Sequence, residues 1–392
     1  MSTASSVTRP PVILQVLPAL ETGGVERGTV DMALAIQHAG WVPVVASTGG
    51  RLVAELERHN ILHLTLPLRS KSPLTIRRNI DRLRDVIYDY RVNLVHARSR
   101  APAWSAYYAA KREGVPFVTT YHGTYNGGLW GLKDRYNAIM TRGARVIAIS
   151  QFIADHIIRT HGTPSDIIRV IPRGVDIDSL NPATISQNRV VHLVQKWQLA
   201  DRLGVPVVML PGRLTRWKGQ EVLIAALAHR QQRGDLCCLL VGSDQGRHQY
   251  SAALREQITR NSLHGMVHLV GECADMPAAY LLSDLVISAS TDPEAFGRVV
   301  VEGQAMGRPV IATNHGAAAE TVLDGQTGVL IPPNDPVALA AAIDHLVALS
   351  PDQRRAVAQA GRAHVAAHFT KAMMCERTLA VYEELLSGHV NA

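Results

Sequence analysis

Two glutamates, Glu294 and Glu302, stand eight residues apart in the stretch whose residue types point most directly to chemistry. They follow the apolar run Leu285–Ile287, which is typical of a buried strand of a parallel sheet. Glu294 falls in the predicted loop after this strand, and Glu302 falls inside a helix predicted from Gly297. Because a helix rises 1.5 Å per residue, the two carboxylates could hold two parts of one elongated ligand.

The backbone between these glutamates predicts an anion site. Residues Ala295, Phe296 and Gly297 lead into the helix, and the first N–H groups of a helix have no intrahelical acceptor. Carboxylates suit hydroxyl groups and bare N–H groups suit phosphate, so the stretch offers what a sugar nucleotide needs. The alternative is an ordinary amphipathic helix flanked by two acidic residues.

Two cations follow the first predicted strand of the C-terminal half. Arg213 and Lys218 belong to the sequence PGRLTRWKG, which places them at a strand end and near a helix start. Guanidinium and ammonium groups at such a place can neutralise a diphosphate leaving group. Arg216 lies between them and is predicted to be solvated.

Two further motifs occur in the N-terminal half. Gly23 and Gly24 lie at a strand-to-helix turn, where glycine lets the backbone approach a phosphate. Their spacing is not that of a dinucleotide fingerprint, and no suitably placed acidic residue follows, which argues against an NAD site. His122, in the sequence YHGT, ends another predicted strand and can donate or accept a hydrogen bond.

The region around the two glutamates resembles the signature of the retaining GT-B glycosyltransferases of family 4. The matching letters are EAFGRVVVEGQAMGRPVIAT, then GAAAE, then GQTGVL. The resemblance covers nearly the whole chain and implies two Rossmann-like α/β domains facing across a cleft. It also implies a last helix, Lys371 to Ser387, that crosses back onto the first domain.

The same resemblance implies a reaction and a role for each motif. A hexose-like sugar would pass from a nucleoside diphosphate sugar, as co-substrate without a further cofactor, to an acceptor hydroxyl with α linkage. Arg213, Lys218 and the backbone at Gly23 and Gly24 would bind the diphosphate. Glu294 and the N–H groups of residues 295–297 would orient the sugar, Glu302 would hold the ribose, and His122 would assist at the sugar. The catalytic set is thus His122, Arg213, Lys218 and Glu294.

Strand and helix patterns alternate through both halves, which predicts parallel sheets covered on both faces. The segment Arg173–Gln187 breaks the alternation and is predicted to be a linker. We expect an acceptor-binding domain over residues 1–180, a nucleotide-sugar-binding domain over 181–370 and the returning helix over 371–392. The predicted strands begin at residues 12, 41, 63, 93, 116, 145 and 167 in the first half and at 207, 236, 267, 285, 310 and 328 in the second.

Composition narrows the class of protein. Apolar residues make up 47% and charged residues 19% of the chain, as in folded globular proteins. The four cysteines lack metal-ligand spacing and are expected to be reduced, and no apolar run reaches the roughly 18 residues of a membrane span. With no predicted signal peptide, these features favour a cytoplasmic protein.

Positive charge is concentrated in one part of the chain. From Arg51 to Arg112 there are 13 Lys/Arg against 5 Asp/Glu, a balance of +8, whereas the whole chain carries +7. Arg77, Arg78, Arg82 and Arg84 share one predicted helix. This helix is either a solvated face or a contact for anionic membrane or an acidic acceptor, such as a lipid-linked or saccharide acceptor in cell-envelope lipopolysaccharide, glycolipid or polysaccharide synthesis. No nucleic-acid module accompanies the charge, so nucleic acid is not an expected partner.

A metal is not expected. The one D-x-D pair, Asp176 and Asp178, lies in the predicted linker and is interpreted as a turn or helix cap. Three alternatives stay open beside glycosyl transfer: a GT-B epimerase, a GT-B phosphorylase and a non-catalytic sugar-nucleotide sensor.

Overall fold

The computed structural model describes residues 9–390 except 22, 126–131, 203 and 231–235. The chain divides into two compact units. Unit 1 comprises the chain up to Pro172 together with the segment from Ala372 onward, and unit 2 comprises Arg173–Lys371. Unit 2 therefore starts eight residues before the expected boundary at 180/181. The reason is local: Val175 forms a bridge with Thr370, so the predicted linker is built into unit 2.

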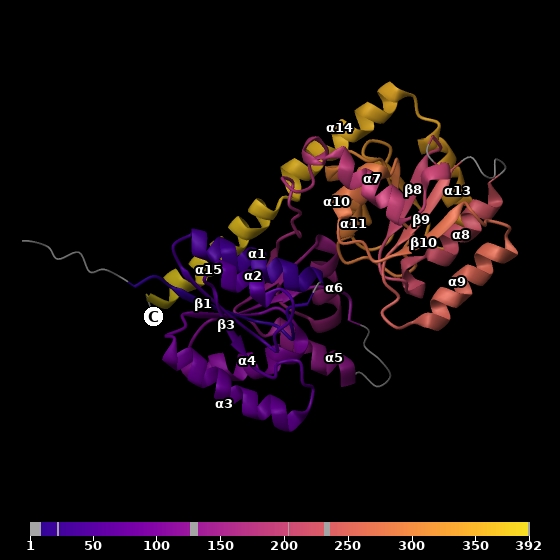
Figure 1. The fold of residues 1–392 in the computed structure, drawn as a ribbon. Coiled ribbons are helices and arrows are strands. Elements are labelled where there is room, and N and C mark those ends of the chain that lie inside the picture. Colours follow the sequence, from indigo (N-terminus) through magenta and orange to yellow (C-terminus); the bar gives the residue numbers. More distant parts are fainter. Residues whose placement is uncertain (1–8, 22, 126–131, 203, 231–235, 391–392) are drawn as a thin grey trace, which may run out of the picture. The chain divides into compact units, whose positions relative to one another are not determined.

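Unit 1 is a seven-stranded parallel sheet in the order β3-β2-β1-β4-β5-β6-β7. Its strands are β1 (Val12–Val16), β2 (Val42–Ser47), β3 (Leu62–Thr65), β4 (Leu94–Ala97), β5 (Phe117–Tyr121), β6 (Arg145–Ala148) and β7 (Ile168–Val170). Its helices are α1 (Gly24–His38), α2 (Val53–Arg58), α3 (Pro73–Asp89), α4 (Arg100–Glu113), α5 (Leu132–Asn137), α6 (Gln151–His161) and α15 (Lys371–Val390) (Figure 1).

Unit 2 is a six-stranded parallel sheet in the order β10-β9-β8-β11-β12-β13. Its strands are β8 (Val207–Pro211), β9 (Cys237–Val241), β10 (Val267–Gly271), β11 (Leu285–Ser288), β12 (Val310–Thr313) and β13 (Gly328–Ile331). Its helices are α7 (Gln187–Lys196), α8 (Gln220–His229), α9 (His248–Arg260), α10 (Met276–Leu282), α11 (Arg298–Ala305), α12 (Ala318–Thr321), α13 (Pro336–Val347) and α14 (Pro351–His368). The predicted strands of both halves are confirmed to within a few residues at their ends.

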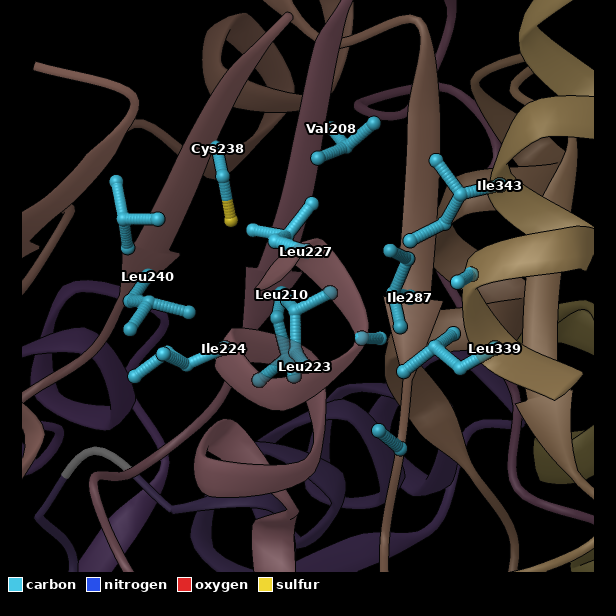
Figure 2. Close-up of a cluster of buried hydrophobic side chains, with 14 of the residues drawn as sticks. Val208, Leu210, Leu223, Ile224, Leu227, Cys238, Leu240, Ile287, Leu339 and Ile343 are labelled. Carbon is cyan, nitrogen blue, oxygen red and sulfur yellow. The ribbon is translucent and has the colours of Figure 1, made fainter. Parts of the chain in front are cut away.

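The core of unit 2 shows how sequence spacing produces these layers. Alternate residues of β8 and β9 point to one face of the sheet. Helix α8 covers this face with residues three or four positions apart, and α13 covers it with residues that include Leu339 and Ile343, one turn apart (Figure 2). The labelled members of this buried cluster are Val208, Leu210, Leu223, Ile224, Leu227, Cys238, Leu240, Ile287, Leu339 and Ile343. Burial of each large side chain contributes about 1.5–3 kcal/mol.

The four cysteines are free thiols. Burial raises the pKa of the Cys237 thiol to about 11, which keeps that thiol protonated and unreactive at neutral pH. No helix in the described part of the chain is long and apolar enough to cross a membrane.

The last helix, α15, packs on the sheet of unit 1, as expected. A buried hydrogen-bond chain fastens it: Tyr382 Oη lies 2.6 Å from Nδ1 of His96 on β4, and the opposite ring nitrogen of His96 lies 2.7 Å from Thr120 Oγ1. His96 and Tyr382 are both fully buried. Near the end of the helix, Glu384 contacts Arg145 and Arg169. The helix is thus held by a polar contact inside the core and by charge at its exposed end.

Replacement of Tyr382 by phenylalanine tests this buried chain. The change removes only the hydroxyl and leaves Nδ1 of His96 without its partner, so we expect the free energy of unfolding to fall by about 1–3 kcal/mol. Urea unfolding measures the change. The matched control is Tyr88→Phe, because Tyr88 is 77% exposed on α3; an equal loss in the two variants would contradict the role of the buried contact.

The same histidine predicts a pH dependence of stability. Burial, and secondarily the Arg98 charge, place the pKa of His96 well below its usual value. Above about pH 6.5 both folded and unfolded chains carry neutral His96, and below that value only the unfolded chain takes up the proton. Stability should then fall with decreasing pH, by up to about 1.4 kcal/mol per pH unit from this group. Urea titrations of wild type and His96→Gln should show a shallower decline in the variant; parallel declines would refute the assignment.

Candidate functional site

The residues predicted to do chemistry in unit 2 gather where the order of its sheet reverses direction. β8 and β11 are neighbours, although β9 and β10 separate them in sequence. Crossovers leave such a pair toward opposite sides and open a crevice at the carboxyl ends of the strands, where open α/β sheets bind ligands. The loop after β8 carries Arg213 and Lys218, and the loop after β11 carries Glu294.

Glu294 is fixed through its backbone and through one of its two carboxylate oxygens. Its carbonyl accepts a hydrogen bond from Ala317 N–H at 2.9 Å, in a bridge between Glu294 and Gly316. Oε1 accepts from Ser290 Oγ at 2.6 Å and contacts Lys218 Nζ. Oε2 has no hydrogen-bond partner among the described residues, so it is the oxygen left for a ligand hydroxyl.

Lys218 is shielded from solvent, whereas Arg213 is not. The Lys218 side chain is 15% exposed and the Glu294 side chain 14%, and the ammonium group also lies 4.2 Å from the centre of the Trp217 ring. The Arg213 side chain is exposed and forms no ion pair within the described residues. Arg216, as predicted, is solvated, with a side chain 81% exposed.

Two glycines allow the loop after β11 to lie close to the loops after β8 and β12. Gly219 ends the loop after β8 with φ of 72°, and a Cβ atom there would lie 1.8 Å from the carbonyl oxygen of Ala289. Gly316, with φ of 71°, would place a Cβ atom 2.3 Å from the carbonyl oxygen of Glu294. A larger residue at position 219 would push apart the loops after β8 and β11, which carry Lys218 and Glu294. A larger residue at position 316 would push the loop after β12 away from Glu294.

Glu302 lies inside α11 and uses both carboxylate oxygens in protein contacts. Oε2 accepts from Tyr280 Oη at 2.7 Å, and Oε1 pairs with Arg298 Nε at 2.6 Å. Burial and the neighbouring Glu302 carboxylate raise the pKa of Tyr280 well above its usual value, so Tyr280 stays a hydrogen-bond donor. A carboxylate oxygen has two acceptor positions, so Glu302 retains capacity for hydroxyl groups of a ligand.

The residues between the glutamates form the predicted helix start. Gly297 caps α11 with φ of 80°, and the first hydrogen bond of the turn runs from Val300 N–H to the Gly297 carbonyl. Phe296 is buried against the Phe369 ring at 5.6 Å between centroids, which anchors this turn. Ala295 completes the connection from Glu294. The helix therefore begins where the sequence predicts, directly after Gly297, which lies three residues beyond Glu294.

The remaining predicted residues belong to unit 1. His122 directly follows β5 and is half-buried. Gly23 caps α1 and Gly24 is its first residue; the Glu26 carboxylate occupies the space that a Cβ atom on Gly23 would need. Thr22 of this motif lies outside the described residues.

The D-x-D pair is a turn, as interpreted from sequence. Asp176 Oδ1 accepts from the backbone N–H groups of Asp178 and Ser179, and Oδ2 pairs with Lys371 Nζ at 2.7 Å. Within the described residues, no group of three or more His, Cys, Asp or Glu side chains has the arrangement of a metal site.

Ser290 and Tyr280 are functional candidates that the sequence does not reveal. Ser290 belongs to the same loop as Glu294, and no motif distinguishes its hydroxyl from that of Ser288. Tyr280 lies on α10, 22 residues before Glu302, and only the folded structure brings the two side chains together. Spacing therefore identifies the carboxylates but not the groups that orient them.

Two family sequence models match the chain. The model described as "Glycosyl transferases group 1" matches residues 194–364, and the model described as "Glycosyltransferase Family 4" matches residues 22–179. The first match contains Arg213, Lys218, Glu294 and Glu302.

Solved structures resemble the chain over nearly its whole length. A glycosyltransferase from Rickettsia africae is 39% identical, with a TM-score of 0.89, over 97% of this chain and 99% of that one. HepE of Anabaena, solved in complex with UDP-glucose, is 26% identical with a TM-score of 0.82, over 95% of this chain and 100% of that one.

A curated relative, the D-inositol 3-phosphate glycosyltransferase of Xylanimonas cellulosilytica, is 29% identical over 69% of this chain. The alignment spans 66% of that relative's length, and 62% and 52% of the lengths of two others. The two matched models, the paired Rossmann-like sheets and the likeness to the Rickettsia enzyme over both full lengths lead to one classification: the chain belongs to the group 1 glycosyltransferases of the GT-B fold.

Proposed function

We propose that this protein transfers a hexose-like sugar from a nucleoside diphosphate sugar to an acceptor hydroxyl and leaves the product in the α configuration. The observation that carries the proposal is the contact of Lys218 with Glu294 at the β8/β11 crossover. A cation suited to phosphate and a carboxylate suited to sugar hydroxyls share one partly buried place. The UDP-glucose complex of HepE supports a nucleotide-sugar donor, with UDP as the first base to test.

The reaction needs negative charge stabilised on the leaving group. As the bond from the anomeric carbon to the phosphate oxygen breaks, its electron pair stays on the diphosphate, and Lys218, Arg213 and the N-terminus of α11 stabilise that charge. The sugar becomes oxocarbenium-like, and the acceptor oxygen attacks the face from which the diphosphate departs. The acceptor proton passes to the departing phosphate oxygen, and this front-face path retains the configuration.

Glu294 and Glu302 bind different parts of the sugar-nucleotide donor. Oε2 of Glu294 accepts a sugar hydroxyl, while Ser290 and Lys218 hold the other oxygen in place. Glu302, oriented by Tyr280 and Arg298, accepts hydroxyls of the ribose. The roles of His122, Gly23 and Gly24 stay those predicted from the sequence.

The acceptor is proposed to be a saccharide or a lipid-linked saccharide of the cell envelope, reached from the cytoplasmic side of the membrane. The predicted basic helix is α3. Arg77 and Arg78 are exposed on it, but Arg84 pairs with Glu113 at 2.7 Å and Arg82 donates to Asn79. The helix therefore offers fewer uncommitted charges than its sequence indicates, and a membrane contact there would be weak and salt-sensitive.

Substitution of each glutamate separates sugar binding from nucleotide binding. Glu294→Gln should lower kcat while changing the Kd for nucleoside diphosphate little, because Glu294 holds the sugar. Glu302→Ala should mainly raise that Kd. Steady-state kinetics and calorimetry measure the two effects, with Glu256→Gln, 69% exposed on α9, as the control. The division of roles fails if both glutamate variants change nucleotide affinity equally.

Catalysis is predicted to need no divalent metal, because Lys218 and the helix N-terminus already supply positive charge at the leaving group. EDTA should leave the rate of nucleoside diphosphate release unchanged. Lys218→Ala should lower kcat by about 10²–10³-fold, as does loss of one charge-stabilising donor in other enzymes. Loss of turnover on chelation, with recovery on addition of manganese, would overturn this prediction.

A further inference from the structure

A second pocket lies within unit 1, at the corresponding reversal of its own sheet. β1 and β4 are neighbours, with β2 and β3 on one side and β5 to β7 on the other. A cavity of about 460 Å³ opens at their carboxyl ends, where Pro18 follows β1 and Ser99 follows β4. This volume suits a ligand the size of a phosphorylated monosaccharide. No predicted site residue lines this cavity.

The charges around the cavity have one sign. Among the described residues, no carboxylate lines it and four basic side chains do: Arg69, Lys71, Arg100 and Lys133. None of the four forms an ion pair with an acidic residue in the described part of the chain, whereas Arg84 of α3 and Arg112 of α4 both do. Uncompensated cations in a concave site create a potential that attracts an anion.

Two buried polar groups in the same cavity lack partners. Asn137 is 1% exposed; its Oδ1 accepts from Arg100 at 2.9 Å, but its Nδ2 has no acceptor among the described residues. The hydroxyl of Tyr136 is also buried without a described partner. A buried donor without an acceptor costs about 1–3 kcal/mol, so the fold keeps these two polar side chains beside the cavity at a cost in stability.

The pocket is also pre-organised. Asn137 holds the Arg100 guanidinium, which lies 3.9 Å from the centre of the Tyr125 ring. Arg100 is the first residue of α4, a helix of 14 residues whose N-cap, Ser99, makes no side-chain cap hydrogen bond. The N–H groups of that first turn add donors and partial positive charge to the four cations.

We propose that this pocket binds a phosphate group of the acceptor, as a monoester or a diphosphate. The proposal rests on the glycosyl transfer proposed above and assigns the class of acceptor that the unit takes. Phosphate fits because it carries up to two negative charges and several acceptor oxygens. The Arg100 guanidinium, held by Asn137, and the ammonium groups of Lys71 and Lys133 can share these oxygens. The phosphate belongs either to a soluble sugar phosphate or to a lipid phosphate.

Calorimetry on the full chain tests the pocket without turnover. Glucose 6-phosphate should bind to protein saturated with UDP, whereas glucose should not. Lys71→Ala and Arg69→Ala should each weaken phosphate binding by about tenfold or more, the loss expected for one charged hydrogen bond. Lys111→Ala, which removes an exposed lysine at the far end of α4, should bind as wild type does. Equal binding by the Lys71 and Lys111 variants, or equal affinity for glucose and its phosphate, overturns the proposal.

A second arm distinguishes the two sources of phosphate. Phosphatidylcholine vesicles with and without polyprenyl phosphate are tested by flotation, and preference for the phosphate-bearing vesicles that is lost in Lys71→Ala assigns a lipid source. Binding of the soluble sugar phosphate without vesicle preference assigns a soluble acceptor, and absence of both overturns the proposal. UDP binding and turnover of the sugar-nucleotide donor are measured on the same protein samples. Nucleotide binding without phosphate binding refutes the proposed pocket alone. Phosphate binding without donor turnover refutes the proposed function alone.

Discussion

The site in unit 2 depends on one constraint: the loops after β8 and β11 must touch. Glu294 meets this constraint with a side-chain contact with Lys218, while a backbone bridge to Gly316, in the loop after β12, fixes the position of Glu294 itself. The backbone of Thr291 adds a hydrogen bond to the Trp217 carbonyl at 2.8 Å. Because Gly219 and Gly316 leave no room for side chains, the carboxylate and the ammonium group are held by backbone geometry and not by flexible side chains alone.

Both units place polar residues at a reversal of the strand order in their sheet, but the charges of these residues differ. In each, the order of the sheet reverses between two strands, β1 and β4 in unit 1 and β8 and β11 in unit 2, and polar residues collect at their carboxyl ends. Unit 2 places a carboxylate beside a lysine there, which suits a sugar joined to phosphate. Among its described residues, unit 1 places four cations and no carboxylate around its pocket, which suits an anion such as phosphate.

The sequence predicts the sheets well because their strands are short apolar runs between turns, and buried parallel strands have no other pattern. It also predicts Glu294, Lys218 and Gly297, which lie within short motifs. It does not predict contacts between segments that only folding brings together. The His96–Tyr382 contact joins residues 286 positions apart, and the phosphate pocket takes Lys71, Arg100 and Lys133 from three separate segments.

Charge counted along the chain is misleading for the same reason. The arginines of α3 attract attention because they are adjacent in sequence, yet Arg84 is neutralised by Glu113 from the neighbouring helix α4. Arg69 and Lys71 precede α3 and line the cavity. Neither forms an ion pair with a carboxylate among the described residues. The functional use of a basic segment depends on which of its charges the fold leaves without a partner.

The central claim is that unit 2 recognises a sugar nucleotide through its diphosphate as well as its sugar. Calorimetric titration with UMP, UDP and UDP-glucose, repeated with the guanosine and adenosine series, tests it most directly. For one base, affinity should rise by about tenfold or more from monophosphate to diphosphate, because Lys218 and the start of α11 bind the added phosphate. Equal affinities for monophosphate and diphosphate in every series, or no binding of any of them, would contradict the account.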